Sequence, residues 1–159
     1  MTADPPLWCP DTSAFVNPWN KWYPPDVAPG YWSRHEELAR SDRLRVSEEV
    51  REELEKVEDD LYAWAKASLD WFPLTEDVQR LVAEIMARYG RLVDTRKNRS
   101  RADPFVIATA AVTDAIVITT EEHGTAAKPK IPYVCGELGV PCVNVLEFIR
   151  AERIQLGGS

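Results

Sequence analysis

Cysteine and histidine are scarce in this 159-residue chain. Its three cysteines, Cys9, Cys135 and Cys142, are far apart, and no two of them form a close pair. An odd and sparse set argues against a disulfide framework, and the lack of close pairs argues against a zinc ribbon. We therefore expect a reducing, cytoplasmic location. His35 and His123 are the only histidines, which suits a metal site made of carboxylates alone.

Long apolar runs and glycine-rich phosphate loops are also missing. No segment approaches the roughly 20 apolar residues of a membrane span. The first residues, Met-Thr-Ala-Asp-Pro-Pro, have neither the basic start nor the apolar stretch of a signal peptide. Neither G-x-x-x-x-G-K-[ST] nor G-x-G-x-x-G occurs. We expect no membrane contact and no nucleotide site of the phosphate-loop kind.

Positive charge is in deficit, because the formal net charge is -7. A protein that coats nucleic acid by general attraction would be basic. An enzyme that binds a divalent cation, in contrast, must collect carboxylates. The hydrophobic content of 45% is enough for one packed core. We assign a single domain to residues 1–156 and expect a disordered tail at 157–159.

Short apolar segments alternate with helical patterns along the chain. The expected strands are 7–9, 44–46, 115–119 and 141–143. The expected helices, after an irregular Trp/Pro-rich segment and a helix ending near residue 40, are 48–57, 61–69, 76–89, 103–112, 133–138 and one from 144. Ser47, Thr75 and the pair Asn144 and Glu147 are suitable helix caps. The alternation predicts an α/β domain with a mainly parallel sheet flanked by helices.

Acidic residues follow these elements at one predicted edge of the sheet. Asp11 follows the first strand, and Glu121, with the neighbouring Glu122 as a rival, follows the strand at 115–119. Asp103, an N-cap candidate before Pro104, opens the helix that leads into that strand. Glu53 lies early in the helix after the second strand, with Glu49 and Glu52 as rivals. Because ligands bind at the carboxyl ends of parallel strands, we expect these acids to meet.

Carboxylates gathered at one edge repel one another unless a cation joins them. Mg²⁺ or Mn²⁺ is the natural choice, since both prefer oxygen ligands and keep several waters. Such an ion can activate water and stabilise the charge of a phosphoryl displacement. The acids therefore predict metal-dependent phosphoryl chemistry.

Four segments resemble the motifs of PIN domains, in the same order. Residues 11–15, Asp-Thr-Ser-Ala-Phe, are similar to the first motif, and residues 50–54, which contain Glu53, to the second. Residues 103–110 resemble the third, an aspartate that opens an apolar helix. Residues 119–121, Thr-Thr-Glu, resemble the fourth, a Thr-x-Asp at a strand end. The resemblance extends from about residue 7 to residue 150.

This resemblance implies a three-layer PIN-like fold and Mg²⁺- or Mn²⁺-dependent RNA cleavage. It makes Asp11, Glu53, Asp103 and Glu121 the catalytic and metal-binding acids, with Asp11 and Asp103 as direct ligands. The other two would bind a second metal or orient the attacking water. Many small prokaryotic members, VapC-like proteins among them, are toxins held inactive by an antitoxin. PIN domains often form homodimers, so both kinds of partner are expected.

Three departures from the PIN pattern affect the expected metal geometry or indicate a divergent subfamily, and the first of them, with the acidic net charge, keeps a non-cutting function open. Glu121 replaces the usual aspartate, Pro10 precedes the first acid, and the segment 17–32 is atypically rich in Trp and Pro. A PIN-like module that binds RNA or protein without cutting is the main alternative. A phosphotransferase with Asp11 as nucleophile is less favoured, because Ser13 stands where a second aspartate would be needed.

Candidate substrate contacts come from two further segments. A basic stretch before Asp103 could grip RNA phosphates or be a solvated loop; the residues assigned to substrate from it are Arg96, Lys97, Arg99 and Arg101. Ser13 is assigned to substrate binding, or to orienting Asp11. The aromatic side chains of 17–32 could stack on bases, form a partner or dimer contact, or make a minor core; they are Trp19, Trp22, Tyr23, Tyr31 and Trp32.

Overall fold

Short parallel strands run through the middle of the molecule. The computed structural model describes residues 4–93 and 101–158. One sheet has the order β1-β4-β5, and a second pairs β2 with β3. The strands are β1 (Trp8–Pro10), β2 (Val46–Ser47), β3 (Trp71–Phe72), β4 (Ile116–Ile118) and β5 (Cys142–Val143). Each pairing is parallel, as predicted.

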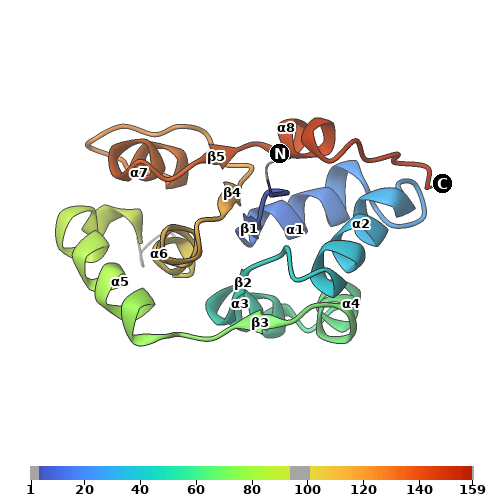
Figure 1. Cartoon of the computed structure of the whole chain (residues 1–159), viewed down its shortest axis with the longest axis horizontal. Coiled ribbons are helices and arrows are strands. Elements are labelled where there is room, and N and C mark those ends of the chain that lie inside the picture. Colours follow the sequence, from blue (N-terminus) through green and yellow to red (C-terminus); the bar gives the residue numbers. More distant parts are fainter. Residues whose placement is uncertain (1–3, 94–100, 159) are drawn as a thin grey trace.

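A parallel bridge between Trp8 and Leu44 joins the two sheets. The amide of Trp8 donates to the carbonyl of Arg43 at 2.9 Å, and its carbonyl accepts from the amide of Arg45 at 2.8 Å. The continuous order is therefore β3-β2-β1-β4-β5, which can be followed through Figure 1. Strands β2 and β3 lie on one side of β1, and β4 and β5 lie on the other. The direction in which the chain adds strands therefore reverses between β3 and β4, and the switch point lies between the neighbouring strands β1 and β4. Ligands of open parallel sheets bind at such a switch point.

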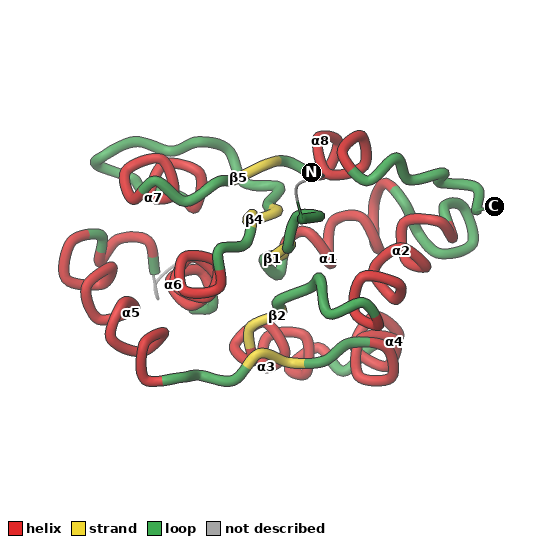
Figure 2. Tube along the Cα trace, viewed as in Figure 1, coloured by secondary structure: helices red, strands yellow, loops and turns green. Residues whose placement is uncertain are grey.

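Helices cover both faces of these strands. They are α1 (Ser13–Asn17), α2 (Pro29–Arg40), α3 (Glu48–Val57), α4 (Asp60–Ser68), α5 (Glu76–Arg88), α6 (Asp103–Thr113), α7 (Ile131–Leu138) and α8 (Val145–Ala151). A π-helical turn, η1 (Pro18–Trp22), extends α1, and a 3-10 turn, η2 (Gly90–Leu92), follows α5. Figures 1 and 2 show α5 and α6 on one side of the strands and α1 and α2 on the other. The predicted three-layer α/β architecture is confirmed.

The predicted helix caps are present. The side chain of Ser47 accepts a hydrogen bond from the amide of Glu49 at 3.2 Å, and that of Thr75 accepts from Val78 at 3.3 Å. Asn144 and Glu147 bond each other's amides, at 2.8 and 3.1 Å, in a capping box. The sequence could predict these caps because each cap side chain accepts a hydrogen bond from an amide that the first helical turn leaves without a partner.

Two local details differ from the sequence-based expectations. The strand β3 was not predicted, because its two residues Trp71 and Phe72 lie between a helix and Pro73 and show no alternating pattern. The N-cap of α6 is Ala102, and Asp103 is the first helical residue instead of the cap. Of the tail at 157–159, for which the sequence predicts disorder, the structure describes Gly157 and Gly158. The amide of Gly158 donates to the carbonyl of Gln155 at 2.9 Å.

An aromatic cluster fills the space between α1, α2, α4 and α8. Tyr31 and Trp32 are buried, and Trp19 packs edge-on against Trp32 with ring centroids 4.8 Å apart. The minor-core interpretation is thus confirmed for these three side chains. The hydroxyl of Tyr31 donates to the carbonyl of Ala14 at 2.9 Å. This bond ties the cluster to α1, the helix that follows Asp11.

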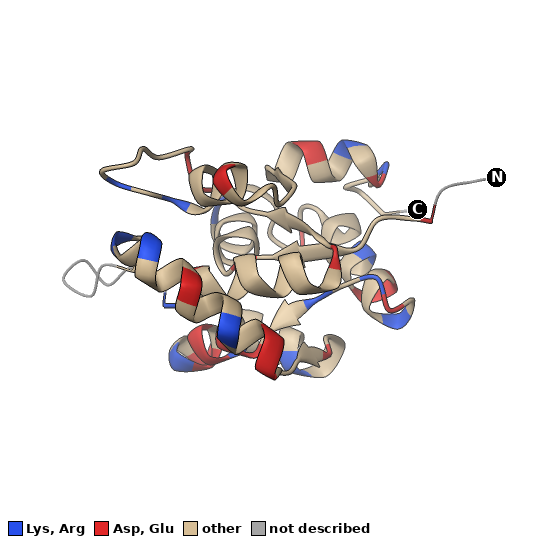
Figure 3. Ribbon diagram, turned by 60° about the vertical axis from the view of Figure 1, so that its left-hand side comes forward, with Lys and Arg blue, Asp and Glu red and all other residues tan. Residues whose placement is uncertain are grey.

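Charged side chains lie along the outer surfaces of the helices. Figure 3 shows acidic and basic positions interspersed on them and not separated onto two faces. Arg80 on α5, for example, pairs with Glu76 at 3.3 Å and with Asp77 at 3.5 Å. Among the described residues, no helix combines the length and apolarity needed to cross a membrane.

Candidate metal centre

Asp11 lies at the carboxyl end of β1 and is almost completely buried, with 1% of its surface exposed. Its amide donates to the carbonyl of Ile118, the last residue of β4, at 2.9 Å. Its Oδ1 accepts from the Ser13 hydroxyl at 2.6 Å and from the Ala14 amide at 2.9 Å. Its Oδ2 accepts from the Thr119 hydroxyl at 2.5 Å. The carboxylate is therefore held from the start of α1 and from the residue that follows β4.

Two further carboxylates converge on Asp11. Asp103, also buried, comes from the first turn of α6, and the half-buried Glu121 follows β4. One oxygen from each of the three carboxylates lies within 4.8 Å of the others. The sheet topology explains this meeting, because β1, β4 and the start of α6 all reach the switch-point edge.

Glu53 lies beside this group but outside it. Its Oε1 accepts a hydrogen bond from the amide of Ala102 at 2.8 Å. Because Ala102 is the N-cap of α6, Glu53 holds the backbone directly before Asp103. The rivals named in the sequence analysis are not in the cluster: Glu49 is half-buried, and Glu52 and Glu122 are exposed.

Glu121 is oriented by two backbone contacts. Its amide donates to the hydroxyl of Thr119 at 3.1 Å, and its Oε2 accepts from the amide of Ile131 at 3.1 Å. Ile131 is the first residue of α7, so Glu121 satisfies an amide at the start of that helix. The bonds to Thr119 at the end of β4 and to the first residue of α7 therefore fix the direction of the Glu121 side chain.

Burial dominates the electrostatics of Asp11. Burial and, to a smaller extent, the nearby charge of Glu121 raise the pKa of the carboxyl, whereas the bonds from Ser13, Thr119 and Ala14 lower it; the net result is a pKa of about 7. The first turns of α1, α6 and α7 also contact the acids, and their dipoles favour negative charge there. The donors reduce the cost of a buried carboxylate but do not remove it, so a nearby positive charge would be favourable.

The three acids suit a hard divalent cation. The group contains only carboxylates, the ligands that Mg²⁺ and Mn²⁺ prefer, and no histidine or cysteine. Ligands on opposite sides of one Mg²⁺ ion are about 4 Å apart, given Mg–O distances near 2.1 Å. The span of up to 4.8 Å between these oxygens is close to that value. Asp11, Asp103 and Glu121 are therefore the residues that would hold such an ion.

The residues predicted to contact substrate do not all lie at the acid cluster. Ser13 donates to Asp11 at 2.6 Å and its Oγ accepts from the amide of Thr120 at 3.0 Å, so it orients the acid. Arg101 is exposed and lies two residues before Asp103. Arg96, Lys97 and Arg99 lie outside the described residues. Contact of these four residues with substrate stays a prediction.

Thr119 is the contributor that sequence reasoning left without a role. Its hydroxyl donates to Asp11 and accepts from the amide of Glu121, so it joins two acids of the group. The signal was available in the Thr-x-acid pattern at 119–121. Thr119 and Glu121 also line a polar pocket of about 190 Å³, together with His123, Asn144 and Glu147.

The sequence matches a family profile over nearly its whole length. The profile is described as Domain of unknown function (DUF4411), and it matches residues 8–156. The chain belongs to this family. The match extends from β1 through α8, so the family unit contains every acid of the candidate centre. Among curated proteins, none matches the sequence.

Solved structures provide a second comparison. The chain is similar to one chain of VapBC2 from Rickettsia felis, whose structure was determined bound to a DNA fragment from their promoter. The TM-score is 0.54, the sequence identity is 14%, and the alignment covers 87% of this chain and 98% of that one. At this identity the likeness shows the fold. The VapC-like PIN fold predicted from the four motifs is thereby confirmed.

Proposed function

We propose that this protein is a metal-dependent endoribonuclease that hydrolyses RNA phosphodiesters at the Asp11–Asp103–Glu121 cluster. The observation that carries the proposal is the convergence of these three carboxylates within 4.8 Å at the switch point of a PIN-like fold. A buried acid cluster is costly to maintain in a fold unless it serves a cation. Mg²⁺ or Mn²⁺ is the expected ion.

The proposed roles follow from the contacts of each side chain. When bound, the ion would supply an activated water and neutralise charge on the phosphate. Asp11, held by Ser13, Ala14 and Thr119, gives the site a ligand of fixed direction. Asp103 and Glu121 complete the ligand set. Glu53 positions the start of α6 through Ala102, and its assignment as a catalytic and metal-binding acid stays part of the proposal.

The wider assignment concerns substrate, partner and location. Arg101 and the predicted contacts Arg96, Lys97 and Arg99 would bind RNA phosphates beside the acids. The similar solved chain comes from VapBC2, which supports a toxin role with an antitoxin partner. All three cysteines are free thiols, as expected of a cytoplasmic protein.

Cleavage of a mixed single-stranded RNA pool tests the proposal. Purified wild type, Asp11→Asn and Asp103→Asn are incubated with the pool in Mn²⁺ and in EDTA. We expect cleavage by wild type in Mn²⁺ alone, and none in EDTA or by either variant. Equal trace cleavage in all samples would indicate a contaminant. No cleavage by folded wild type with bound Mn²⁺ would favour the alternative, a PIN-like module that binds RNA or protein without cutting.

A further inference from the structure

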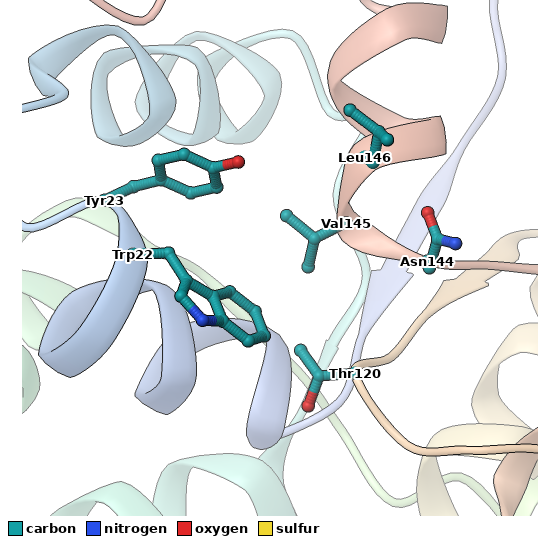
Figure 4. Close-up of a pocket in the computed structure, with 6 residues that line it drawn as sticks. All are labelled: Trp22, Tyr23, Thr120, Asn144, Val145 and Leu146. Atoms are coloured by element: carbon teal, nitrogen blue, oxygen red, sulfur yellow. The ribbon is translucent and has the colours of Figure 1, made fainter.

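A small apolar slot lies between the end of η1 and the start of α8. Its volume is about 220 Å³, and its lining residues are Trp22, Tyr23, Thr120, Asn144, Val145 and Leu146. Figure 4 shows the rings of Trp22 and Tyr23 on one side and Val145 and Leu146 on the other. None of the charged side chains that the structure describes lines it. The slot therefore suits a flat, uncharged group.

The exposure of the slot walls distinguishes them from the nearby core. Trp22 is 48% exposed and Leu146 is 49% exposed, whereas Tyr31 and Trp32 of the same Trp/Pro-rich segment are buried. Single exposed apolar residues are ordinary, but here they face each other across one slot. The arrangement leaves aromatic and aliphatic surface available to a ligand.

The slot adjoins the carboxylate cluster through a short chain of hydrogen bonds. The amide of Thr120, a lining residue, donates to the Ser13 hydroxyl at 3.0 Å, and that hydroxyl donates to Asp11 at 2.6 Å. Asn144 lines both the slot and the polar pocket that contains Glu121. One face of the site is therefore polar and the other is apolar, with Asn144 between them.

A nucleotide of RNA has the same two-sided chemistry, since a charged phosphate is attached to a flat base. The slot is smaller than the roughly 300–1,000 Å³ of pockets for drug-sized ligands. It suits one ring system and not a peptide segment. We propose that the slot binds one nucleobase of single-stranded RNA, stacked against Trp22, next to the phosphate held at the acid cluster. The inference rests on the proposed function for its RNA substrate.

The bonds already made by the polar lining residues indicate what kind of recognition this is. Asn17 donates to the hydroxyl of Thr120 at 2.7 Å, and the side-chain oxygen of Asn144 accepts from the amide of Glu147 at 2.8 Å. The side-chain oxygens of Thr120 and Asn144 thus each already accept a bond from within the protein. Stacking is sequence-tolerant because every base has a π-face. We therefore expect the slot to bind any of the four bases with little preference among them.

Fluorescence anisotropy with a labelled oligouridine tests this inference in Ca²⁺, which takes oxygen ligands as Mg²⁺ and Mn²⁺ do, and a gel of the same samples shows that the strand stays intact. The same RNA with a single abasic position, placed at each site in turn, is the second probe. We expect Trp22→Ala to weaken binding of the intact RNA by about 5- to 150-fold, the range for loss of one base stack. Trp22→Phe should retain most of the binding. Val57→Ala, at an exposed apolar position on α3, should change nothing.

The abasic probes separate a base contact from a general loss of folding. One abasic position should weaken binding to wild type but not to Trp22→Ala, because the two changes remove the same contact. Equal losses in both proteins, or no RNA binding at all, would overturn the inference. So would a change from dimer to monomer in Trp22→Ala with unchanged RNA binding, which would make the slot a protein contact. Trp22-dependent binding without any cleavage would refute the nuclease proposal alone.

Discussion

Two buried polar side chains, Asp11 and His35, are held in opposite ways. Three donors contact the Asp11 carboxylate, two from the start of α1 and one from the end of β4. His35 has one bond, in which its Nδ1–H donates to the carbonyl of Tyr31 at 2.8 Å, and its Nε2 has no partner among the described residues. The donors around Asp11 can stabilise its charged form, whereas His35 lacks a second partner that would stabilise its charged form.

The surroundings of the two side chains follow the same division. Asp11 lies among hydroxyls, amides and other acids, whereas His35 lies among aromatic rings. The rings within about 6 Å of His35 belong to Phe15, Tyr31, Trp32, Trp64 and Phe148. Ala14 connects the regions, since its amide donates to Asp11 and its carbonyl accepts from Tyr31. The aromatic cluster thus holds α1 in the place where it contacts the acid.

The largest expected effect comes from neutralising Asp11. Asp11→Asn preserves the shape of the side chain, and the Thr119 hydroxyl can rotate to accept from the new amide. We expect metal-dependent cleavage to fall by at least about 100-fold, more than the usual loss from an outer-shell change. Without metal, the melting temperature should stay the same or rise, because a buried charge is removed. Cleavage rates and thermal melts measure both; unchanged cleavage would contradict the account.

Removal of the Thr119 hydroxyl tests whether the support of Asp11 matters. Thr119→Val leaves Asp11 Oδ2 and the Glu121 amide without their partner. We expect Mn²⁺ affinity or cleavage to fall by roughly 10- to 100-fold, as for other outer-shell ligands. Thr109→Val is the matched control, because the Thr109 hydroxyl is buried and has no hydrogen-bond partner within residues 4–93 and 101–158. If both variants lost the same activity, the effect would be one of packing.

Acid should destabilise the aromatic region. Burial lowers the pKa of His35 from 6.5 to about 4, so between these values the unfolded chain binds more protons than the folded one. The contribution of His35 to stability is therefore lost as the pH falls from about 6.5 to about 4, by up to about 3 kcal/mol. Asp11, whose pKa is raised, acts in the opposite direction over an overlapping range.

A difference measurement isolates the histidine from Asp11. Urea unfolding is followed at several pH values for wild type and His35→Phe, which share the Asp11 contribution. The stability difference between the two proteins should change between pH 6.5 and 4 and be constant above pH 7.5. A difference that does not depend on pH would mean that His35 does not titrate in this way.

Gly30 provides a smaller, purely structural test at the other end of the aromatic region. A Cβ at this position, near the start of α2, would lie 1.7 Å from the carbonyl oxygen of Gln155. Since backbone atoms must move, Gly30→Ala should cost about 1–3 kcal/mol in unfolding free energy. Gly136→Ala, in α7 with open space around it, should be neutral or stabilising by up to about 1 kcal/mol. Denaturant unfolding compares the two, and equal effects would refute the close approach.

The sequence predicted those features that are encoded locally. Ser47, Thr75 and Asn144 marked helix starts through the hydrogen bonds of their own side chains. The edge shared by Asp11, Asp103 and Glu121 followed from the rule that parallel strands end together. Glu53 proved harder to place, because its bond to Ala102 depends on how α3 packs beside α6.

Features that form between segments distant in sequence were harder to predict. The slot at Trp22 needs α8 to lie against η1, which no local pattern specifies. Likewise, the division of the aromatic residues into a buried set and the exposed Trp22 depends on tertiary packing. The strand β3 is only two residues long and exists through its pairing with β2. In each case the deciding interaction joins parts of the chain that are far apart in sequence.

Calorimetric titration of Mn²⁺ into wild type and Asp103→Asn tests the central claim most directly, because it measures the ion at the three acids without any substrate. A thermal melt of each protein beforehand establishes that both are folded. The account predicts saturable Mn²⁺ binding by wild type and at least about tenfold weaker binding by Asp103→Asn. Equal Mn²⁺ affinity in the two folded proteins, or none in wild type, would contradict a metal centre formed by Asp11, Asp103 and Glu121.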